Sequence, residues 1–326
     1  PFPYTTLFRS DIPLGLIDPA RFAGGRLPID PSASAKALAQ DVGTPLGLKA
    51  DRAAFGVSEI VDEAMASAGR MHAVESGKDL GPRLMIAFGG NGPLHATRVA
   101  RRAQVRRILI PRDPGVGSAV GFLFAPVSFE IVRSRYATLD TLDLDGLNAF
   151  LATMAQEARE VVHAGAPSAP LSTRRVAFMR YHGQGHEIEI PLPDGVLTAT
   201  DLPALRAAFE TEYRRQFRRT VPGMTLALLN WALSVASPPP PRTAQGSIPP
   251  PSPPRPLTTR QILCDVTESW RDAGVFDRSD LSPGDQIAGP ALIIEPQTTT
   301  LVSADFDATI DASGNIWLTR TEETAA

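Results

Sequence analysis

Apolar positions recur along the chain with two different spacings, and the two spacings separate expected helices from expected strands. Recurrence every three to four residues predicts helices, whereas short apolar or alternating runs predict strands. The expected helices cover 32–40, 58–77, 114–125, 142–164 and 201–219. The expected strands cover 84–88, 105–110, 129–136, two runs within 173–192, 225–236, 262–266, 291–294, 299–302, 308–310 and 316–318. This mixed order predicts an α/β fold whose last part is rich in strands.

The stretch around residue 90 carries the clearest candidate chemistry. An apolar run at 84–88, interpreted as a buried strand, is followed by Gly89, Gly90 and Gly92, and Pro93 then begins an amphipathic helix. A glycine turn lets backbone approach a ligand closely, and a helix start offers free N–H groups to an anion. The spacing matches neither the dinucleotide fingerprint nor a P-loop. The pattern fits a ligand-binding turn and a purely structural turn equally well.

Composition narrows the class of protein. The 326 residues carry 32 Lys and Arg against 35 Asp and Glu, a net charge of −3 that gives no reason to expect nucleic-acid binding. The single cysteine, Cys264, excludes an intrachain disulfide and fits a reducing compartment. No apolar run approaches the roughly 20 residues of a membrane helix. We therefore expect a soluble, cytoplasmic protein without a membrane partner.

Composition shifts also suggest the domain boundaries. The proline-rich segment 237–256 is expected to be an extended linker, with a β-rich domain at 257–326 after it and an α+β domain at 138–236 before it. The preceding part of the chain would form a further domain at 11–137. Residues 1–10 show no periodicity, and Phe2–Ser10 resembles the translation of a sequencing adapter. We expect this segment to be an artefact that makes no organised contact.

Several segments resemble one known family. The stretch FGGNGPLHA at 88–96 is similar to the signature A-F-G-G-A-G-P-L-H-A of the hydantoinase A/5-oxoprolinase family, which includes acetone and acetophenone carboxylase subunits. Asn91 stands where that signature usually has alanine. Further similar segments lie at 11–38, 114–125, 180–187, 213–231 and 275–302. The resemblance implies part of the second lobe of an actin/sugar-kinase-like ATPase, followed by an α+β domain and a β-rich domain. The family's N-terminal phosphate loops have no counterpart, so the chain looks like a C-terminal fragment.

The resemblance also implies a nucleotide site at the glycine turn. The residues it assigns to ATP are Gly89, Gly90, Asn91, Gly92, Pro93 and His95. For His95, one turn into the helix, packing or capping is an equal alternative. Mg²⁺ would be held mainly by the N-terminal part that the chain lacks. The sequence identifies no catalytic residue.

A second candidate lies at 180–187, RYHGQGHE, which resembles the family's R-Y-x-G-Q-x-x-E motif. Arg180, Tyr181, Gln184 and Glu187 match it and form a possible functional turn. The alternative is a structural hairpin in which Arg180 pairs with Glu187. His182 and His186 have a spacing that suits a metal on a helix, but the intervening glycines disfavour a helix, and we predict no metal site.

The implied activity is ATP-dependent phosphorylation of a cyclic amide carbonyl for ring-opening hydrolysis, performed with a hydantoinase B-like partner. Phosphorylation turns the carbonyl oxygen into a leaving group, which an amide otherwise lacks. A ketone carboxylase subunit shares every motif and is the alternative, and a non-catalytic fragment that retains partner-binding surfaces is a third. We expect the fragment alone to be inactive.

Overall fold

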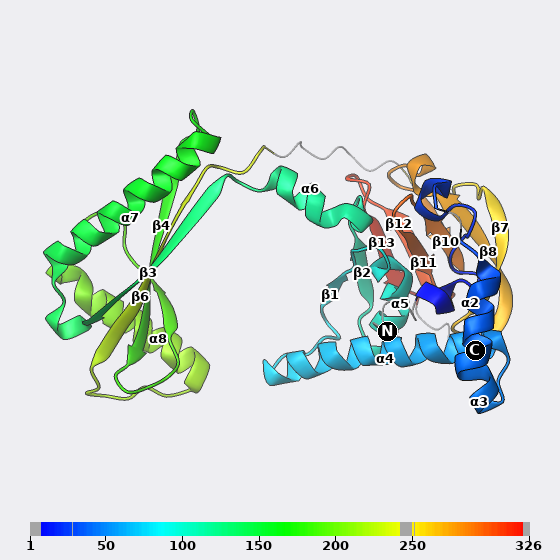
Figure 1. The fold of residues 1–326 in the computed structure, drawn as a ribbon, viewed down its shortest axis with the longest axis horizontal. Coiled ribbons are helices and arrows are strands. Elements are labelled where there is room, and N and C mark those ends of the chain that lie inside the picture. The colour runs from blue at the N-terminus through cyan, green and yellow to red at the C-terminus, as the bar shows by residue number, and fades with distance from the viewer. Residues whose placement is uncertain (1–7, 28, 242–249, 251, 322–326) are drawn as a thin grey trace. The chain divides into compact units, whose positions relative to one another are not determined.

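The computed structural model describes residues 8–27, 29–241, 250 and 252–321, which form two compact units (Figure 1). The first unit combines residues 1–122 with 243–326, and the second consists of residues 123–242. The chain therefore leaves the first unit, builds the second, and returns. This division differs from the predicted boundaries, because strands from 257–320 share a sheet with strands from 84–110.

The first unit contains a five-stranded sheet in the order β1-β2-β13-β12-β9. Only β1 and β2 are parallel in it, and helix α5 connects them. The strands are β1 (Leu84–Ile86), β2 (Arg107–Ile110), β13 (Ile316–Arg320), β12 (Phe306–Ile310) and β9 (Gln286–Ala288). Helix α5 (Gly92–Arg102) packs between this sheet and the long helix α4 (Ala50–Glu75). The parallel pair and its helix form the strand-turn-helix unit expected around residue 90.

A second sheet of the first unit also packs against α5. Its order is β11-β10-β8-β7, and its strands are β11 (Thr299–Val302), β10 (Ala291–Ile294), β8 (Ser269–Asp277) and β7 (Thr258–Cys264). Strand β11 contacts α5, and the apolar side chains of residues 12–17 pack on this sheet. The backbone N–H of Leu263 donates to the carbonyl of Leu14 (3.0 Å). The shorter helices are α2 (Pro31–Leu38), α3 (Thr44–Leu46) and α6 (Gly117–Phe124).

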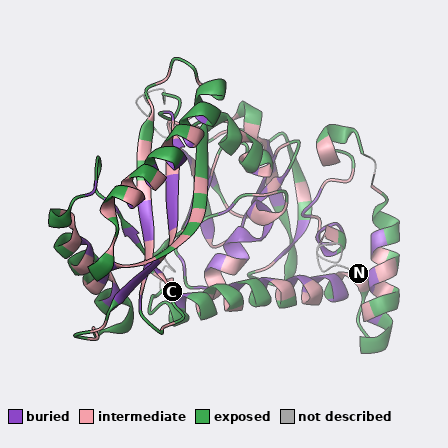
Figure 2. Ribbon diagram, turned by 60° about the vertical axis from the view of Figure 1, so that its left-hand side comes forward, coloured by how far each residue is buried: buried purple, intermediate pink, exposed green. Residues whose placement is uncertain are grey.

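The second unit is a four-stranded antiparallel sheet with helices packed on one face. The sheet order is β3-β6-β4-β5, with β3 (Ser128–Thr138), β6 (Leu226–Ala236), β4 (Ser172–Tyr181) and β5 (Ile188–Pro191). Helices α7 (Leu144–Gly165) and α8 (Leu202–Phe217) share one hydrophobic core with the strands. Trp231 is fully buried in this core, and its indole N–H donates to the carbonyl of Arg135 (2.9 Å). Figure 2 shows buried positions gathered in the strands and exposed positions along much of α4 and α7.

Two sequence-based expectations are wrong for the first unit. The run at 84–88 is buried on one face only: Leu84, Ile86 and Phe88 are between 41% and 59% exposed, whereas Ala87 is buried and Met85 packs against the same core. The predicted absence of contact by residues 1–10 also fails for the described part. The ring of Phe8 packs on Phe22 at 5.0 Å, and Ser10 is fully buried.

The predicted helices are confirmed, although α4 begins eight residues before the predicted start, at Ala50 rather than residue 58. Strands β8 and β9 were not predicted, since neither has a continuous apolar run. Within the described residues, no helix combines the length and the apolar character needed to cross a membrane.

Candidate functional site

The glycine turn lies between β1 and α5. Gly89 has a φ of 101°, a conformation that side chains with a Cβ rarely adopt, and its N–H donates to the carbonyl of Pro114 (2.8 Å). Gly90 has an ordinary φ and is exposed. A Cβ at Gly90 would meet only the Gln297 carbonyl oxygen, at 3.8 Å. The backbone conformation therefore requires glycine at position 89. At position 90 the surrounding structure leaves room for a side chain.

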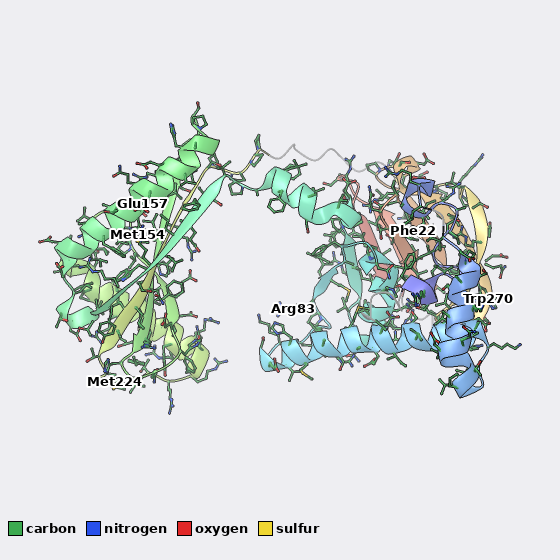
Figure 3. The ribbon with its side chains drawn as sticks, in the orientation of Figure 1. Phe22, Arg83, Met154, Glu157, Met224 and Trp270 are labelled. Atoms are coloured by element: carbon green, nitrogen blue, oxygen red, sulfur yellow. The ribbon has the colours of Figure 1, made fainter. Side chains whose placement is uncertain are left out.

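A cavity of about 730 Å³ opens beside this turn and lies wholly within the first unit. Three segments form its wall: the loop at 17–26, the turn at 90–94, and the β10–β11 connection at 294–299. Phe8, Phe22 (labelled in Figure 3), Ile294 and Pro296 supply apolar surface. Asp18, Arg21, Arg26, Asp277, Glu295, Gln297 and Thr298 supply polar groups. Its size and mixed lining are typical of a site for a small organic ligand.

Two of the acidic groups that line the cavity are already paired. Glu295 accepts from the Arg278 guanidinium (2.8 Å), which also donates to the carbonyls of Pro111 and Gly314. Burial raises the pKa of Glu295 above its usual range, although Arg278 opposes this. Asp18 is paired with Arg260. The more exposed guanidinium groups of Arg21 and Arg26 are the cations at the cavity.

Behind the turn lies a buried charge cluster formed by Asp11, Asp62, His95 and Arg98, each at most 3% exposed. His95 Nδ1 is 2.8 Å from Asp62 Oδ1, and His95 Nε2 is 3.3 Å from Asp11 Oδ2. Arg98 Nε lies 2.8 Å from Asp62 Oδ2. The cluster joins α5 to α4 and to the start of the described chain.

Burial alone would lower the pKa of His95, but hydrogen bonds to Asp11 and Asp62 outweigh it and raise the pKa above the usual 6.5. His95 and Pro93 are buried and do not line the cavity, whereas Gly90 and Asn91 do. Sequence reasoning missed Asp11, Asp62 and Arg98. One sequence feature could have indicated this cluster. Asp62 lies four residues from both Ser58 and Ala66, on the buried face of α4, where a charged side chain needs a partner.

The second predicted turn lies in the second unit, and three of its residues are hydrogen-bonded within that unit. Tyr181 is buried, and its hydroxyl accepts from the Val221 N–H (3.1 Å). Gln184 accepts from the Tyr213 hydroxyl (3.2 Å). Glu187 accepts from the Asn230 amide (3.1 Å). In the described second unit, no ion pair is found between Arg180 and Glu187, the pairing that the structural alternative suggested.

The two histidines of that turn also take separate partners. His182 Nδ1 is 3.4 Å from the Tyr136 hydroxyl, and His186 Nε2 is 3.2 Å from Gln216 Oε1. Across the part of the chain that the structure describes, no three His, Cys, Asp or Glu side chains are grouped as a metal site requires.

Comparison with known proteins identifies the family and the fold. A family model for hydantoinase/oxoprolinase matches residues 9–131, and a model for the hydantoinase/oxoprolinase C-terminal domain matches residues 146–319. The caprolactamase subunit alpha of Pseudomonas jessenii is 25% identical over 324 residues, which cover 96% of this chain and 46% of that protein. The acetone carboxylase beta subunit of Xanthobacter autotrophicus is 26% identical over 317 residues, 91% of this chain and 43% of that protein.

A solved structure gives the same fold. The nucleotide-free structure of an acetone carboxylase, which catalyses ATP-dependent acetone carboxylation, superposes with a TM-score of 0.79 at 23% identity. The match covers 97% of this chain and 46% of that one. The chain thus spans less than half the length of the relatives it matches. Since the C-terminal-domain model alone matches more than half of its residues, the chain belongs to the hydantoinase/oxoprolinase family.

Proposed function

We propose that the cavity beside the glycine turn binds the adenosine part of ATP. The observation that carries this proposal is the position of exposed Gly90 and half-buried Asn91 on the wall of a cavity of about 730 Å³. Without a side chain at Gly90, a base or ribose can lie directly against the backbone. The start of α5 adds the backbone N–H of Gly92, which favours an anion. Gly89 acts indirectly, by holding the turn in its left-handed conformation.

In the whole protein, we propose ATP-dependent phosphorylation of a cyclic amide carbonyl, followed by ring opening. The caprolactamase relative, whose name denotes a lactam substrate, supports this reaction. Carboxylation of a ketone is the second candidate, because the acetone carboxylase subunit matches a similar share of the chain. We also propose that Mg²⁺ accompanies ATP and neutralises charge on its phosphates.

Both curated relatives are named as subunits, and we propose a hydantoinase B-like partner for this protein as well. We also propose a cytoplasmic location, on the basis of the single buried cysteine. By itself the chain is expected to bind nucleotide weakly and to have no ATPase activity.

Isothermal titration of the chain with ADP and with ATP tests the site. Gly90→Val should abolish binding, because its side chain would project into the cavity while leaving the fold intact. The matched control is Gly121→Ala in α6, where a Cβ meets nothing within 4 Å and which does not line the cavity. Binding that survives Gly90→Val, or that is lost in both variants, would contradict the assignment.

A further inference from the structure

Two arginines of the loop at 17–26 bring positive charge to one wall of the cavity. Arg21 and Arg26 both line the cavity. The Nε of Arg21 lies 3.9 Å from Asp18 Oδ2, and the Arg21 side chain is 51% exposed. The Nε of Arg26 donates to the carbonyl of Ala23 (3.3 Å), and no ion pair of Arg26 is found within the described residues. Each guanidinium group therefore keeps N–H donors that can bind a ligand.

Asp18 is balanced by Arg260 rather than by Arg21. Its Oδ2 is paired with the Arg260 guanidinium, and its Oδ1 accepts from the Ala20 N–H (3.0 Å). An exposed ionic contact as long as that between Arg21 and Asp18 contributes little. The positive charge of Arg21 is therefore available to the cavity.

A compact left-handed turn separates the two arginines along the chain. Ala23, Gly24 and Gly25 have φ values of 51°, 67° and 76°. The Arg26 N–H donates to the carbonyl of Ala23 (3.4 Å). Alanine rarely adopts this conformation, and residues held in such a conformation are often found at ligand-binding sites. The residues on both sides of the turn, Arg21 and Arg26, face one cavity.

The other acidic groups of the cavity lie on different segments. Glu295, in the β10–β11 connection, is paired with Arg278. Asp277, the last residue of β8, accepts from the N–H (3.0 Å) and the hydroxyl (2.6 Å) of Ser279, and the structure shows no cation beside it in the described chain. An anion that enters the cavity is therefore attracted to the loop at 17–26 and repelled from Asp277.

We propose that Arg21 and Arg26 form an oxyanion site of the cavity and bind the phosphate groups of its ligand. A guanidinium group presents two parallel N–H donors that match two phosphate oxygens, and such charge-assisted hydrogen bonds are short and strong. Phe22 supplies apolar surface beside them. That the ligand is a nucleotide rests on the proposed function. The added inference is that its phosphates lie at the loop at 17–26 and away from Asp277.

Isothermal titration of the whole chain with ADP, adenosine and inorganic pyrophosphate tests the oxyanion site. We expect ADP to bind about tenfold more tightly than adenosine, and pyrophosphate to bind by itself. Arg21→Gln and Arg26→Gln should each weaken ADP and pyrophosphate binding about fivefold to tenfold and leave adenosine binding unchanged. Raising the salt concentration from about 0.05 M to about 0.3 M should weaken the two charged ligands only, because salt screens exposed charges.

Arg83→Gln is the matched control. Like Arg26, Arg83 is exposed and its Nε donates to a backbone carbonyl, that of Asp79 (3.4 Å), but Arg83 does not line the cavity (Figure 3). This variant should bind all three ligands as the unmodified chain does. Equal binding of ADP and adenosine by the unmodified chain overturns the proposal. So does a loss of adenosine binding in Arg21→Gln and Arg26→Gln as large as the loss of ADP binding, or an equal loss of ADP binding in Arg83→Gln.

The same titrations separate this proposal from the proposed function. If adenosine binds and the two arginines add nothing to ADP or pyrophosphate, the oxyanion site is wrong and the nucleoside site stands. If pyrophosphate binds through the arginines and adenosine does not bind, the nucleotide assignment is wrong and the oxyanion site stands. Absence of binding by all three ligands contradicts both.

Discussion

Replacing Gly15 by alanine tests how the N-terminal segment docks on the first unit. Gly15 has a φ of 76°, and a Cβ there would lie 2.2 Å from the carbonyl oxygen of Gln261 in β7. The left-handed conformation costs a non-glycine residue about 1–2 kcal/mol. The clash must also displace the segment and break the hydrogen bond between Leu263 and Leu14, worth about 0.5–1.5 kcal/mol.

Displacement of the segment also loosens the packing of Leu14, which is fully buried. Partial loss of that packing adds about 1–3 kcal/mol, since burying a leucine is worth about this much. We therefore expect Gly15→Ala to lower the opening free energy of the first unit by about 3–5 kcal/mol. Hydrogen exchange of β7 amides, followed by mass spectrometry, reports this unit separately from the second.

Gly47→Ala is the control that isolates the clash. Gly47 has a similar φ of 66°, but a Cβ there meets nothing within 4 Å. Gly47→Ala should lower the opening free energy only by the cost of the left-handed conformation for a non-glycine residue, about 1–2 kcal/mol. Equal effects of the two substitutions would refute the close approach of Gly15 to β7.

Three further substitutions or conditions have defined outcomes. Gly115→Ala would place a Cβ 2.5 Å from the Gln297 side chain, so urea denaturation should show a loss of about 1–3 kcal/mol. Deletion of residues 1–10 removes the packing of Phe8 on Phe22 and should lower Tm by several degrees; an unchanged Tm would support a foreign, unattached segment. The pKa of His95 is raised in the folded state. The contribution of His95 to the free energy of unfolding is therefore complete below the unfolded pKa of about 6.5, and it is lost as pH rises through the folded pKa. Urea midpoints measured across that range should therefore fall, and should do so less in His95→Gln.

The sequence by itself determined most of the secondary structure and the family. Helical spacing identified α4, α7 and α8, and apolar runs identified β6, β10 and β11, because side-chain periodicity is a local property of the chain. The glycines at 89–92 could be recognised as a turn for the same reason. The motif segments were sufficient to indicate the hydantoinase/oxoprolinase family.

Only the tertiary structure decided which residues surround that turn. Asp11, Asp62 and His95 are separated by more than thirty residues from one another, and nothing local to each predicts that they share one buried cluster. Likewise, the return of the chain through β12 and β13 places β2 inside a sheet, one face of which is left uncovered. Leu84 and Ile86 lie on that face and are exposed despite their apolar pattern, as is Arg107 of β2. Burial and charge pairing depend on contacts between distant segments, and a periodic pattern records only which side of an element is apolar.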